Sequence, residues 1–438
     1  MKEHKILIIT YYWPPSGGSG VQRWLKFVKY LPQFGIKPYV FTPANPSFDV
    51  KDESLKKDVP EEAEVIHFPI WEPYQVFFKI SSIFGGSGKS TPTHLVSGKK
   101  RSRFQKFSTW VRGNLIIPDP RVFWVKPAVS FLNDFIRDNE ISTIITTGPP
   151  HSIHLIGLRL KKKAPHIKWV ADFRDPWSEW GLLDSLMVGK LARMGHRALE
   201  KKVLTAADVV TTITPFYVRR FEALSGRKVE LLTNGYDEDD FKTLAIQKTD
   251  KFVIRHVGIV NEKCNPRPSM LALKNLMNEN EKLSALVHVD FVGEVHPDFK
   301  RFVTEDETLR RITTFTPPVP HKDLIKLYNT SSLLLLILTG YKDAAGYMPG
   351  KLFEYIATGL PVLGVGPNEG DAAKLMRQAG VGEMVEGGNS VEIQQKLSFY
   401  FDRWCGQGID AKNNQLNKIY SRRMITERLA EILIILKQ

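Results

Sequence analysis

Short apolar runs that alternate with helical patterns are the feature that most constrains this chain. In the first half these runs, separated by helical patterns, occupy residues 5–10, 37–43, 142–148, 168–173 and 208–214. A second series occupies residues 252–258, 287–293, 312–319, 333–339 and 360–366. Strands separated by helices form βαβ units, whose strands lie parallel in one sheet. The sequence therefore predicts an α/β protein with two doubly wound, Rossmann-like parallel-sheet domains.

The domain boundaries follow from length and composition. The 438 residues suit two cores of roughly 200 residues each, and residues 233–250 are polar and rich in turn formers, as in a linker. We expect an N-terminal domain at 1–235, with a Gly/Ser/Lys-rich insertion at about 75–125, and a C-terminal domain at 250–408. The helical segment 409–438 is expected to pack back on the N-terminal domain. Two such sheets facing each other form a cleft, and ligands bind beyond the carboxyl ends of their strands.

The charge balance favours anionic partners. The formal net charge is +14, from 61 Lys and Arg against 47 Asp and Glu. No zinc finger, aromatic RNA-binding motif or basic recognition helix points to nucleic acid. The densest cationic cluster, residues 98–112, also carries aromatic side chains. It is typical of a segment on an anionic membrane surface, with a solvated basic loop as the alternative.

Targeting and redox signals are absent from the sequence pattern. No apolar run approaches the ~20 residues of a membrane span. Two cysteines far apart exclude a disulfide framework and a cysteine metal site. We therefore expect a cytoplasmic protein, with the inner face of the cell membrane as a candidate location.

A glycine-rich loop separates the first apolar run from the first helical pattern. The sequence there is YYWPPSGGSGVQRW, and the dinucleotide fingerprint G-x-G-x-x-G fails because Arg23 stands at its third glycine. Gly17 and Gly18 still allow a bulky anion to approach the backbone at a helix N-terminus. Ser16 or Ser19 is expected to cap this helix or to donate to the ligand. A tight turn alone is the alternative.

Polar side chains follow two neighbouring apolar runs. In TGPPHS, His151 stands directly after a strand end, where it could polarise a substrate hydroxyl or carry a proton. In DFRDPW, Asp172, Arg174 and Asp175 stand at the end of the next run. Acids and bases beside aromatic residues suit the recognition of sugar hydroxyls. A structural histidine and an internal salt bridge are the respective alternatives.

The most specific stretch is GYMPGKLFEYIATGLPVLGVG, residues 346–366. It predicts a helix that opens at Pro349 and Gly350 and carries Lys351 and Glu354 one turn apart. Lys351 near that N-terminus would supply cationic charge for a diphosphate, and Glu354 could accept the two hydroxyls of a ribose. Without this context, a lysine and a glutamate at this spacing are usually an exposed pair on a helix surface with no binding role.

Taken together, several motifs resemble one enzyme family over nearly the full length. The stretches YYWPPSGGSGVQRWLKFVKYL, TGPPHS, DFRDPW, TNGYD and MPGKLFEYIATGLPVLGV are similar to those of bacterial family-4 glycosyltransferases of the two-Rossmann GT-B architecture. The resemblance implies a hexosyltransferase-type enzyme that needs no metal or cofactor and retains the anomeric configuration. Its donor would be a nucleoside-diphosphate sugar. Its acceptor would be a hydroxyl of a glycan or lipid-linked carrier in surface polysaccharide biosynthesis.

The resemblance also implies roles for single residues. The Gly17–Gly18 turn would approach the diphosphate and sugar of the donor, and His151 would contact the transferred sugar near the reaction centre. Glu354 would bind the ribose, and residues 315–321 would flank the base.

The second domain of the family supplies cations to the diphosphate after the glycine that corresponds to Gly258. Lys263 is the nearest match to these cations, and Arg267 is the next. Many relatives carry a carboxylate eight residues before the ribose-binding glutamate, where this chain has Gly346, with Asp343 nearby. Cys264 also stands near a position that is often arginine. The resemblance therefore does not identify the donor.

Two other functions remain open at this point. A sugar-nucleotide 2-epimerase shares the architecture but requires acids and histidines arranged for elimination of the nucleotide. A noncatalytic binder, lectin-like or specific for a sugar nucleotide, is the third hypothesis. The expected diphosphate site argues against the lectin-like module, which has no need of one. For the transferase, cations and loop N–H groups would stabilise the negative charge that develops on the departing nucleoside diphosphate.

Overall fold

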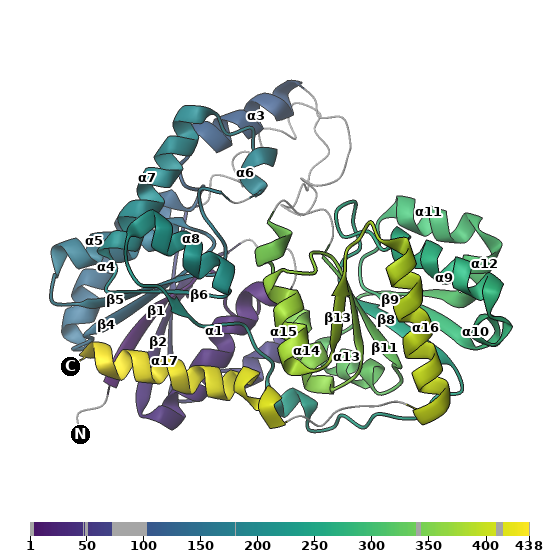
Figure 1. Ribbon diagram of the computed structural model, residues 1–438. Helices are drawn as coiled ribbons and strands as arrows, with labels where there is room; N and C mark the ends of the chain where they lie inside the picture. Colours follow the sequence, from purple (N-terminus) through teal and green to yellow (C-terminus); the bar gives the residue numbers. More distant parts are fainter. Residues whose placement is uncertain are drawn as a thin grey trace. The chain divides into compact units, whose positions relative to one another are not determined.

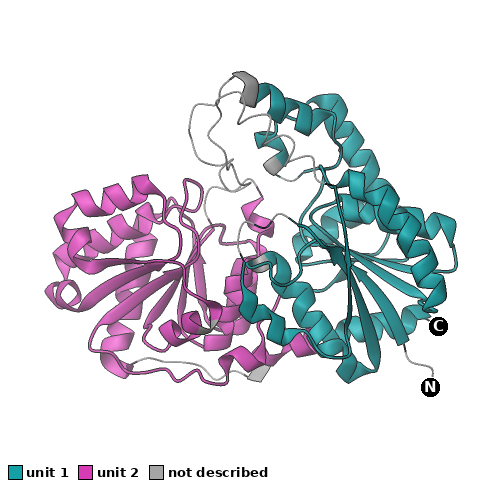
Figure 2. Cartoon of the chain, turned by 180° about the vertical axis from the view of Figure 1, so that it is seen from behind, with its two compact units in different colours: residues 1–233, 426–438 teal, residues 234–425 magenta. Residues whose placement is uncertain are grey.

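The structure, a computed structural model, describes residues 4–46, 48, 51–71, 103–179, 181–338, 343–408 and 415–437. The chain divides into two compact units (Figure 2). Unit 1 comprises residues 1–233 and 426–438, and unit 2 comprises residues 234–425. The division between Thr233 and Asn234 lies at the start of the turn-rich segment 233–250.

Unit 1 is built on a seven-stranded parallel sheet with the order β3-β2-β1-β4-β5-β6-β7. Its strands are β1 (His4–Ile9), β2 (Ile36–Pro43), β3 (Glu64–Phe68), β4 (Thr143–Gly148), β5 (Lys168–Phe173), β6 (Val209–Thr212) and β7 (Glu230–Leu231). Ile6 in β1 pairs with Pro38 in β2 on one side and with Thr143 in β4 on the other. The strand order therefore reverses direction between β1 and β4, as in Rossmann folds.

The helices of unit 1 alternate with these strands (Figure 1). They are α1 (Ser19–Tyr30), α3 (Arg103–Asn114), α4 (Val122–Asp138), α5 (Ser152–Lys163), α6 (Leu182–Ser185), α7 (Lys190–Ala206) and α8 (Pro215–Ser225), with short 3-10 turns η1 (Leu31–Phe34) and η2 (Glu53–Asp58). Residues 103–112 are helical, so the loop alternative for segment 98–112 is wrong for its described part. The rest of the expected insertion, residues 75–102, lies outside the described residues.

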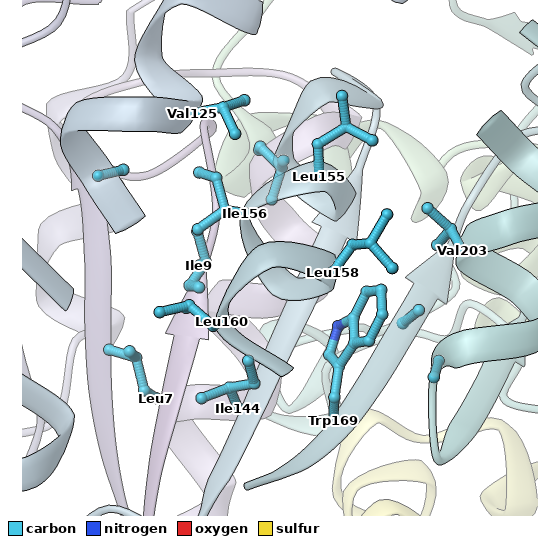
Figure 3. Packing of buried hydrophobic residues seen from close by; sticks show 14 of the residues in the cluster. Leu7, Ile9, Val125, Ile144, Leu155, Ile156, Leu158, Leu160, Trp169 and Val203 are labelled. Carbon is cyan, nitrogen blue, oxygen red and sulfur yellow. The ribbon is translucent and has the colours of Figure 1, made fainter. Parts of the chain in front are cut away.

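One face of the unit 1 sheet is covered by α4, α5 and α7 (Figure 3). Leu155, Ile156 and Leu158 of α5 pack against apolar side chains of β1, β4 and β5. The helix approaches the sheet closely at Gly157, where a Cβ atom would lie 2.4 Å from the indole of Trp169. This close packing explains why a glycine interrupts an otherwise apolar helix face.

Unit 2 is built on a six-stranded parallel sheet with the order β10-β9-β8-β11-β12-β13. Its strands are β8 (Phe252–Val257), β9 (Val287–Val292), β10 (Thr313–Thr316), β11 (Leu333–Ile337), β12 (Val362–Val365) and β13 (Gly382–Val385). Its helices are α9 (Arg267–Glu279), α10 (Glu281–Leu286), α11 (Pro297–Glu305), α12 (Glu307–Ile312), α13 (His321–Tyr328), α14 (Gly350–Thr358), α15 (Asp371–Ala379) and α16 (Ser390–Gln407). Short 3-10 turns are η4 (Glu238–Phe241), η5 (Ala344–Gly346) and η6 (Gln415–Tyr420).

Strand β11 explains the longest apolar run of the sequence. Its residues face two cores in alternation: Leu333, Leu335 and Ile337 join the cluster beneath α9 and α16, whereas Leu334 and Leu336 join the cluster beneath α14 and α15. A parallel strand that is buried on both faces is apolar at every position. The unit 2 sheet is therefore covered by helices on both faces.

The C-terminal helix α17 (Arg422–Lys437) begins in unit 2 and belongs to unit 1 from Thr426 onward. Within unit 1 its side chains Leu429 and Leu433 are fully buried. Among the helices of the described segments, none combines the length and apolar character required to cross a bilayer.

Candidate functional site

The predicted site residues lie where the strand order of each sheet reverses. In unit 1 the glycine-rich loop follows β1 and the TGPPHS loop follows β4, and these two strands are neighbours. In unit 2, Gly258 follows β8, and α14 begins after the loop that follows the neighbouring strand β11. Ligands of open parallel sheets bind at such switch points, beyond the carboxyl ends of the strands. Each unit therefore presents one candidate site.

The glycine-rich loop of unit 1 leads directly into α1. Gly18 is the N-cap residue, with a φ of 84° and no side-chain hydrogen bond that caps the helix. The expectation that Ser16 caps α1 is therefore wrong, since its hydroxyl donates to the carbonyl of Gly17 at 3.5 Å. The side chain of Ser19 lies outside the described part of the structure. The backbone N–H of Ser16 instead donates to the carbonyl of Trp13 at 2.9 Å and closes a turn. The first turn of α1 keeps backbone N–H groups that can face an anion.

Asp172, at the end of β5, is fully buried and bonded on all sides. Its carboxylate accepts hydrogen bonds from Arg23 at 2.8 and 3.2 Å, Trp24 at 2.8 Å, Thr147 at 3.0 Å and Thr211 at 2.8 Å. Burial raises the pKa of Asp172, but the charge and hydrogen bonds of Arg23 and its other donors outweigh this and lower it to about 2. Asp172 does form an internal salt bridge, as the alternative for this cluster supposed, but its partner is Arg23 of α1, outside DFRDPW. The network of Asp172 ties α1 to three strands of the sheet.

The guanidinium of Arg174 donates hydrogen bonds to backbone carbonyls of two loops. Nε donates to Gly148 at 3.1 Å, Nη2 donates to Pro149 at 2.6 Å, and Nη1 donates to Gly20 at 2.6 Å. The guanidinium also lies 5.8 Å from the ring centre of Tyr12. Arg174 therefore fixes the loop after β4 to the first turn of α1.

Asp175 is partly buried beside Arg174. Burial raises the pKa of the Asp175 carboxyl, and the charge of Arg174 opposes this shift. DFRDPW contains two carboxylates. That of Asp172 is held in the network described above, and that of Asp175 lies outside this network.

His151 is the N-cap residue of α5 and is 4% exposed. Its ring stacks on Trp177, with ring centres 5.3 Å apart and an interplanar angle of 4°. Burial, followed by the nearby rings and cations, lowers the pKa of His151 well below 6.5, so the imidazole is neutral at physiological pH. The first turn of α5 is anchored by Asp119, which accepts hydrogen bonds from the backbone and the hydroxyl of Ser152 at 2.8 Å each.

In unit 2, Lys351 lies against Gly258. A Cβ atom on Gly258, whose φ is 118°, would stand 3.4 Å from the Lys351 Nζ. Burial lowers the pKa of Lys351 to about 8, although nearby Cys264 and Glu354 oppose this shift. The amine thus lies at the switch point beside the N-terminus of α14, whose N-cap residue Pro349 provides no side-chain cap.

Glu354, one turn after Lys351, is oriented by two side chains from α13. His321 Nε2 lies 3.1 Å from Glu354 Oε1, and the Tyr328 hydroxyl donates to Oε2 at 3.1 Å. His321 Nδ1 lies 3.7 Å from a carboxylate oxygen of Asp240. The Glu354 side chain remains 22% exposed. Its carboxylate is therefore held in place and still accessible.

The segment expected to flank the base divides into two parts. The ring of Phe315 stacks on Phe291 at 5.9 Å and belongs to the core side of the sheet. His321, at the other end, touches Glu354 instead. The sequence pattern did not indicate Tyr328 or Asp240 as site residues, because neither lies in a motif with Glu354.

Of the two cations expected after Gly258, one is exposed on a loop and the other packs against α11. Lys263 has an exposed side chain on the loop after β8. The Arg267 guanidinium lies 4.6 Å from the ring centre of Phe302 and donates to the carbonyl of Asp298 at 3.4 Å, both on α11. Arg267 lines a cavity of about 590 Å³ beside α11 that includes neither Lys351 nor Glu354 among its lining residues. Lys351 is thus the cation that the structure places directly beside Gly258.

Comparison with known proteins identifies the fold. No protein-family model matches the chain, and no curated protein sequence matches it. A glycosyltransferase from Rickettsia africae ESF-5 has a similar structure, with a TM-score of 0.65 and 13% identity, over 100% of this chain and 99% of that one. WaaG, a glycosyltransferase involved in lipopolysaccharide biosynthesis, matches with a TM-score of 0.53 and 15% identity, over 98% and 99%.

A protein described as a UDP-N-acetylglucosamine 2-epimerase, from Listeria monocytogenes, is also similar. Its TM-score is 0.54 at 11% identity, over 98% of this chain and 95% of that one. Identities this low establish the fold and not the activity. The chain has the fold of the GT-B glycosyltransferases, with two Rossmann-like parallel-sheet domains.

Proposed function

We propose that this protein is a retaining glycosyltransferase that moves a sugar from a nucleoside-diphosphate sugar to a hydroxyl of a glycan or lipid-linked acceptor in surface polysaccharide biosynthesis. The observation that carries the proposal is the pair Lys351 and Glu354, with the amine against Gly258 and the carboxylate accessible. An amine and a carboxylate one turn apart fit the two ends of a ribose diphosphate. The glycosyltransferases among the similar structures, including WaaG, support the same activity.

In this proposal unit 2 binds the nucleotide. Lys351 and the N–H groups at the start of α14 contact the diphosphate, because an amine and a helix N-terminus both attract anions. Glu354 accepts hydrogen bonds from the ribose hydroxyls with the lone pairs that His321 and Tyr328 leave open. Gly258 keeps the space in front of the amine clear, and Lys263 is an additional cation on the neighbouring loop.

Unit 1 supplies contacts to the sugar in this proposal. The Gly17–Gly18 turn, with the first N–H groups of α1 behind it, is the backbone of unit 1 that we propose for contact with the donor. His151 is neutral, so it serves as a hydrogen-bonding group for the transferred sugar and not as a cation. Asp172 and Arg174 position the two loops, and Asp175 is the carboxylate we propose for contact with a sugar hydroxyl.

The reaction follows from these charges. The bond between the anomeric carbon and the diphosphate oxygen breaks, and the acceptor hydroxyl oxygen forms a new bond to the same face of that carbon. The proton of the acceptor hydroxyl passes to the departing diphosphate. Negative charge grows on the departing diphosphate, where Lys351 and backbone N–H groups stabilise it. The proposal requires no metal and no cofactor, since these groups supply the compensating charge.

The epimerase is the second candidate function. It would need a group that exchanges protons with the sugar. Asp172 is buried and its carboxylate accepts five hydrogen bonds, which takes it out of proton transfer. His151, with a strongly lowered pKa, is also poorly suited to hold a proton. These contacts favour the transferase.

A thermal-shift panel followed by product analysis tests the proposal. We expect one of the nucleoside diphosphates UDP, GDP and ADP, but not the monophosphate CMP or NAD, to raise the melting temperature without metal. A ligand at 100 times its dissociation constant adds about 2.7 kcal/mol. The shift is expected to disappear in Glu354→Ala and to persist in Glu369→Ala, a matched change at an 81% exposed carboxylate.

Products then separate the candidates. With the matching sugar nucleotide, the transferase releases the nucleoside diphosphate and moves the sugar to an acceptor hydroxyl or to water. An intact, epimerised sugar nucleotide would contradict the proposal, and so would stabilisation by NAD alone.

A further inference from the structure

Six large apolar side chains are exposed at one end of unit 1. They are Phe107 and Trp110 on α3, Leu115 directly after it, Met187 after α6, and Leu191 and Met194 on α7. Leu191 is 84% exposed, Met194 67% and Phe107 63%. Large apolar side chains exposed together mark an interaction site. We call these six residues the α3–α7 surface.

Direct contacts join the two helices that carry this surface. The Asn114 amide at the end of α3 donates to the carbonyl of Met187 at 3.1 Å and accepts from the backbone N–H of Gly189 at 2.8 Å. A Cβ atom on Gly113 would lie 2.4 Å from the carbonyl oxygen of Leu186. Figure 1 shows α3, α6 and α7 gathered at this end of unit 1. The six apolar residues therefore belong to one connected structure.

The same helices are cationic. Helix α3 contains no acidic residue, and the single acid of α7, Glu200, is 2% exposed and accepts hydrogen bonds from Trp177 and Ser178. Lys190, Arg197 and Lys201 are exposed on α7. They share the helix face of Leu191 and Met194, because residues three, four and seven positions apart lie on one side of a helix.

The acid of α6 is paired with a cation. Asp184 on α6 forms an ion pair with Arg193 at 2.6 Å. This end of unit 1 therefore combines exposed apolar side chains with exposed cations. Lys106, exposed beside Phe107 on α3, extends the pattern.

We propose that the α3–α7 surface docks the protein on an anionic phospholipid membrane. Apolar side chains with cations around them are the combination that a negatively charged bilayer selects, because the apolar groups enter the interface and the cations meet the lipid phosphates. Trp110 is of the residue type enriched at the level of the headgroups. The proposal goes beyond the transferase activity and does not depend on it, since docking needs no donor.

Vesicle flotation tests this surface on the full chain. We expect the wild-type protein to float with phosphatidylglycerol-containing vesicles and to stay behind with pure phosphatidylcholine. The double change Leu191→Glu with Met194→Glu is expected to weaken binding about tenfold or more, because two apolar anchors become anions. The matched control, Val391→Glu with Phe399→Glu on α16, alters the charge equally at side chains 65% and 53% exposed and is expected to bind as wild type does.

A second variant separates charge from apolar insertion. Removing Lys190 and Arg197 by change to Gln is expected to weaken binding about fivefold per cation and to reduce its dependence on salt. Circular dichroism and the nucleotide-induced thermal shift should match wild type in every variant, which keeps a folding failure or a failed transferase proposal distinguishable from a failure of docking.

Three results would overturn the proposal. The first is unchanged flotation of Leu191→Glu with Met194→Glu. The second is equal binding to charged and uncharged vesicles. The third is wild-type self-association without vesicles, measured by sedimentation velocity and abolished by the same double change, because a second copy of the chain would then cover this surface.

Discussion

The two switch-point sites differ in what their charged side chains bind. In unit 1, Asp172 and Arg174 are buried, and their hydrogen bonds go to other parts of the protein. In unit 2, Lys351 and Glu354 are partly exposed. The two sites therefore differ although the sheets share a topology. In unit 1 the charged side chains hold loops in place, and in unit 2 they remain accessible to a ligand.

Burial explains the difference. A charged pair taken out of water needs hydrogen bonds on every side, as Asp172 has, or it destabilises the fold. Glu354 is restrained on one side by His321 and Tyr328 and keeps contact with solvent on the other. We therefore expect mutations at the unit 1 site to lower the stability of the fold. Mutations at the unit 2 site should mainly weaken ligand binding.

The largest effect is expected from Asp172→Ala. The change leaves the guanidinium of Arg23 buried without its carboxylate, and breaking a buried pair from one side costs about 3–5 kcal/mol. Denaturant unfolding followed by tryptophan fluorescence measures this loss. Asp175→Ala serves as the control, since its carboxylate lies outside the network. Loss of less than about 1 kcal/mol would show that the Asp172 network does not hold unit 1 together.

Nearly as large an effect is expected on nucleotide binding from Lys351→Met. Losing a charged donor to a diphosphate costs about 1.5–3 kcal/mol, or roughly 10- to 100-fold in affinity. Calorimetric titration with the stabilising nucleoside diphosphate measures the loss, and Lys274→Met on α9 is the control. Unchanged affinity would remove Lys351 from the site.

Acid should act on unit 1 through Asp172. Its pKa is about 2 in the folded chain against 3.8 for an unperturbed aspartate, so its stabilisation is fully present above about pH 5 and is lost as pH falls toward 2. The contribution lost is about 2 kcal/mol. Stability measured against pH in wild type and Asp172→Asn should differ in slope between about pH 5 and 2. Parallel curves would contradict this assignment.

Alkali should act on unit 2 through Lys351. Because its pKa is about 8, the amine is charged below pH 8. Above pH 8 it is neutral in the free protein and must take up a proton before it can pair with an anionic ligand. Nucleotide affinity is therefore expected to be constant below about pH 8 and to fall by up to about tenfold per pH unit above it. Lys351→Met should remove this dependence, and a profile that is the same in both proteins would count against the role of the amine.

A smaller and local effect is expected from Arg174→Lys. Lysine keeps the charge but cannot reach three carbonyls at once, because it lacks the planar fork of arginine. Amide hydrogen exchange in residues 18–22 should accelerate while the melting temperature changes little. Arg159→Lys is the control, at a residue that lies on the same domain outside these contacts. Unchanged exchange would mean that Arg174 does not fix the loop.

The smallest effect is expected from Ser16→Ala. Gly18 caps α1, so losing the Ser16 hydroxyl should cost less than about 0.5 kcal/mol. In Thr214→Ala, by contrast, the lost oxygen accepts from the backbone N–H of Tyr217 at 3.3 Å, and the loss should cost about 1 kcal/mol. Equal losses in chemical unfolding would restore Ser16 as a cap.

Periodicity made most of the fold predictable. The apolar runs that became β1, β4, β8 and β11 are buried on both faces, and such strands leave a continuous signal. Strand β3 was not predicted, because it is an edge strand in which Glu64 and His67 are exposed. Strand β7 was missed because it has only two residues.

The candidate site was predictable where its residues share one element. Lys351 and Glu354 stand one helical turn apart, so their proximity follows from the sequence. The partners of Glu354 could not be predicted in this way, since His321 and Tyr328 come from positions 33 and 26 residues away. The pairing of Arg23 with Asp172 spans 149 residues and depends on the sheet order.

Calorimetric titration of one nucleoside diphosphate into three proteins decides whether unit 2 binds the nucleotide. The proteins are the wild type, Glu354→Gln and Arg174→Lys, and the ligand is the diphosphate that stabilises the wild type most. We expect roughly 10- to 100-fold weaker binding in Glu354→Gln, from the loss of a charged acceptor, and a change within about threefold in Arg174→Lys. Strong weakening in Arg174→Lys with unchanged binding in Glu354→Gln would place the nucleotide in unit 1 instead.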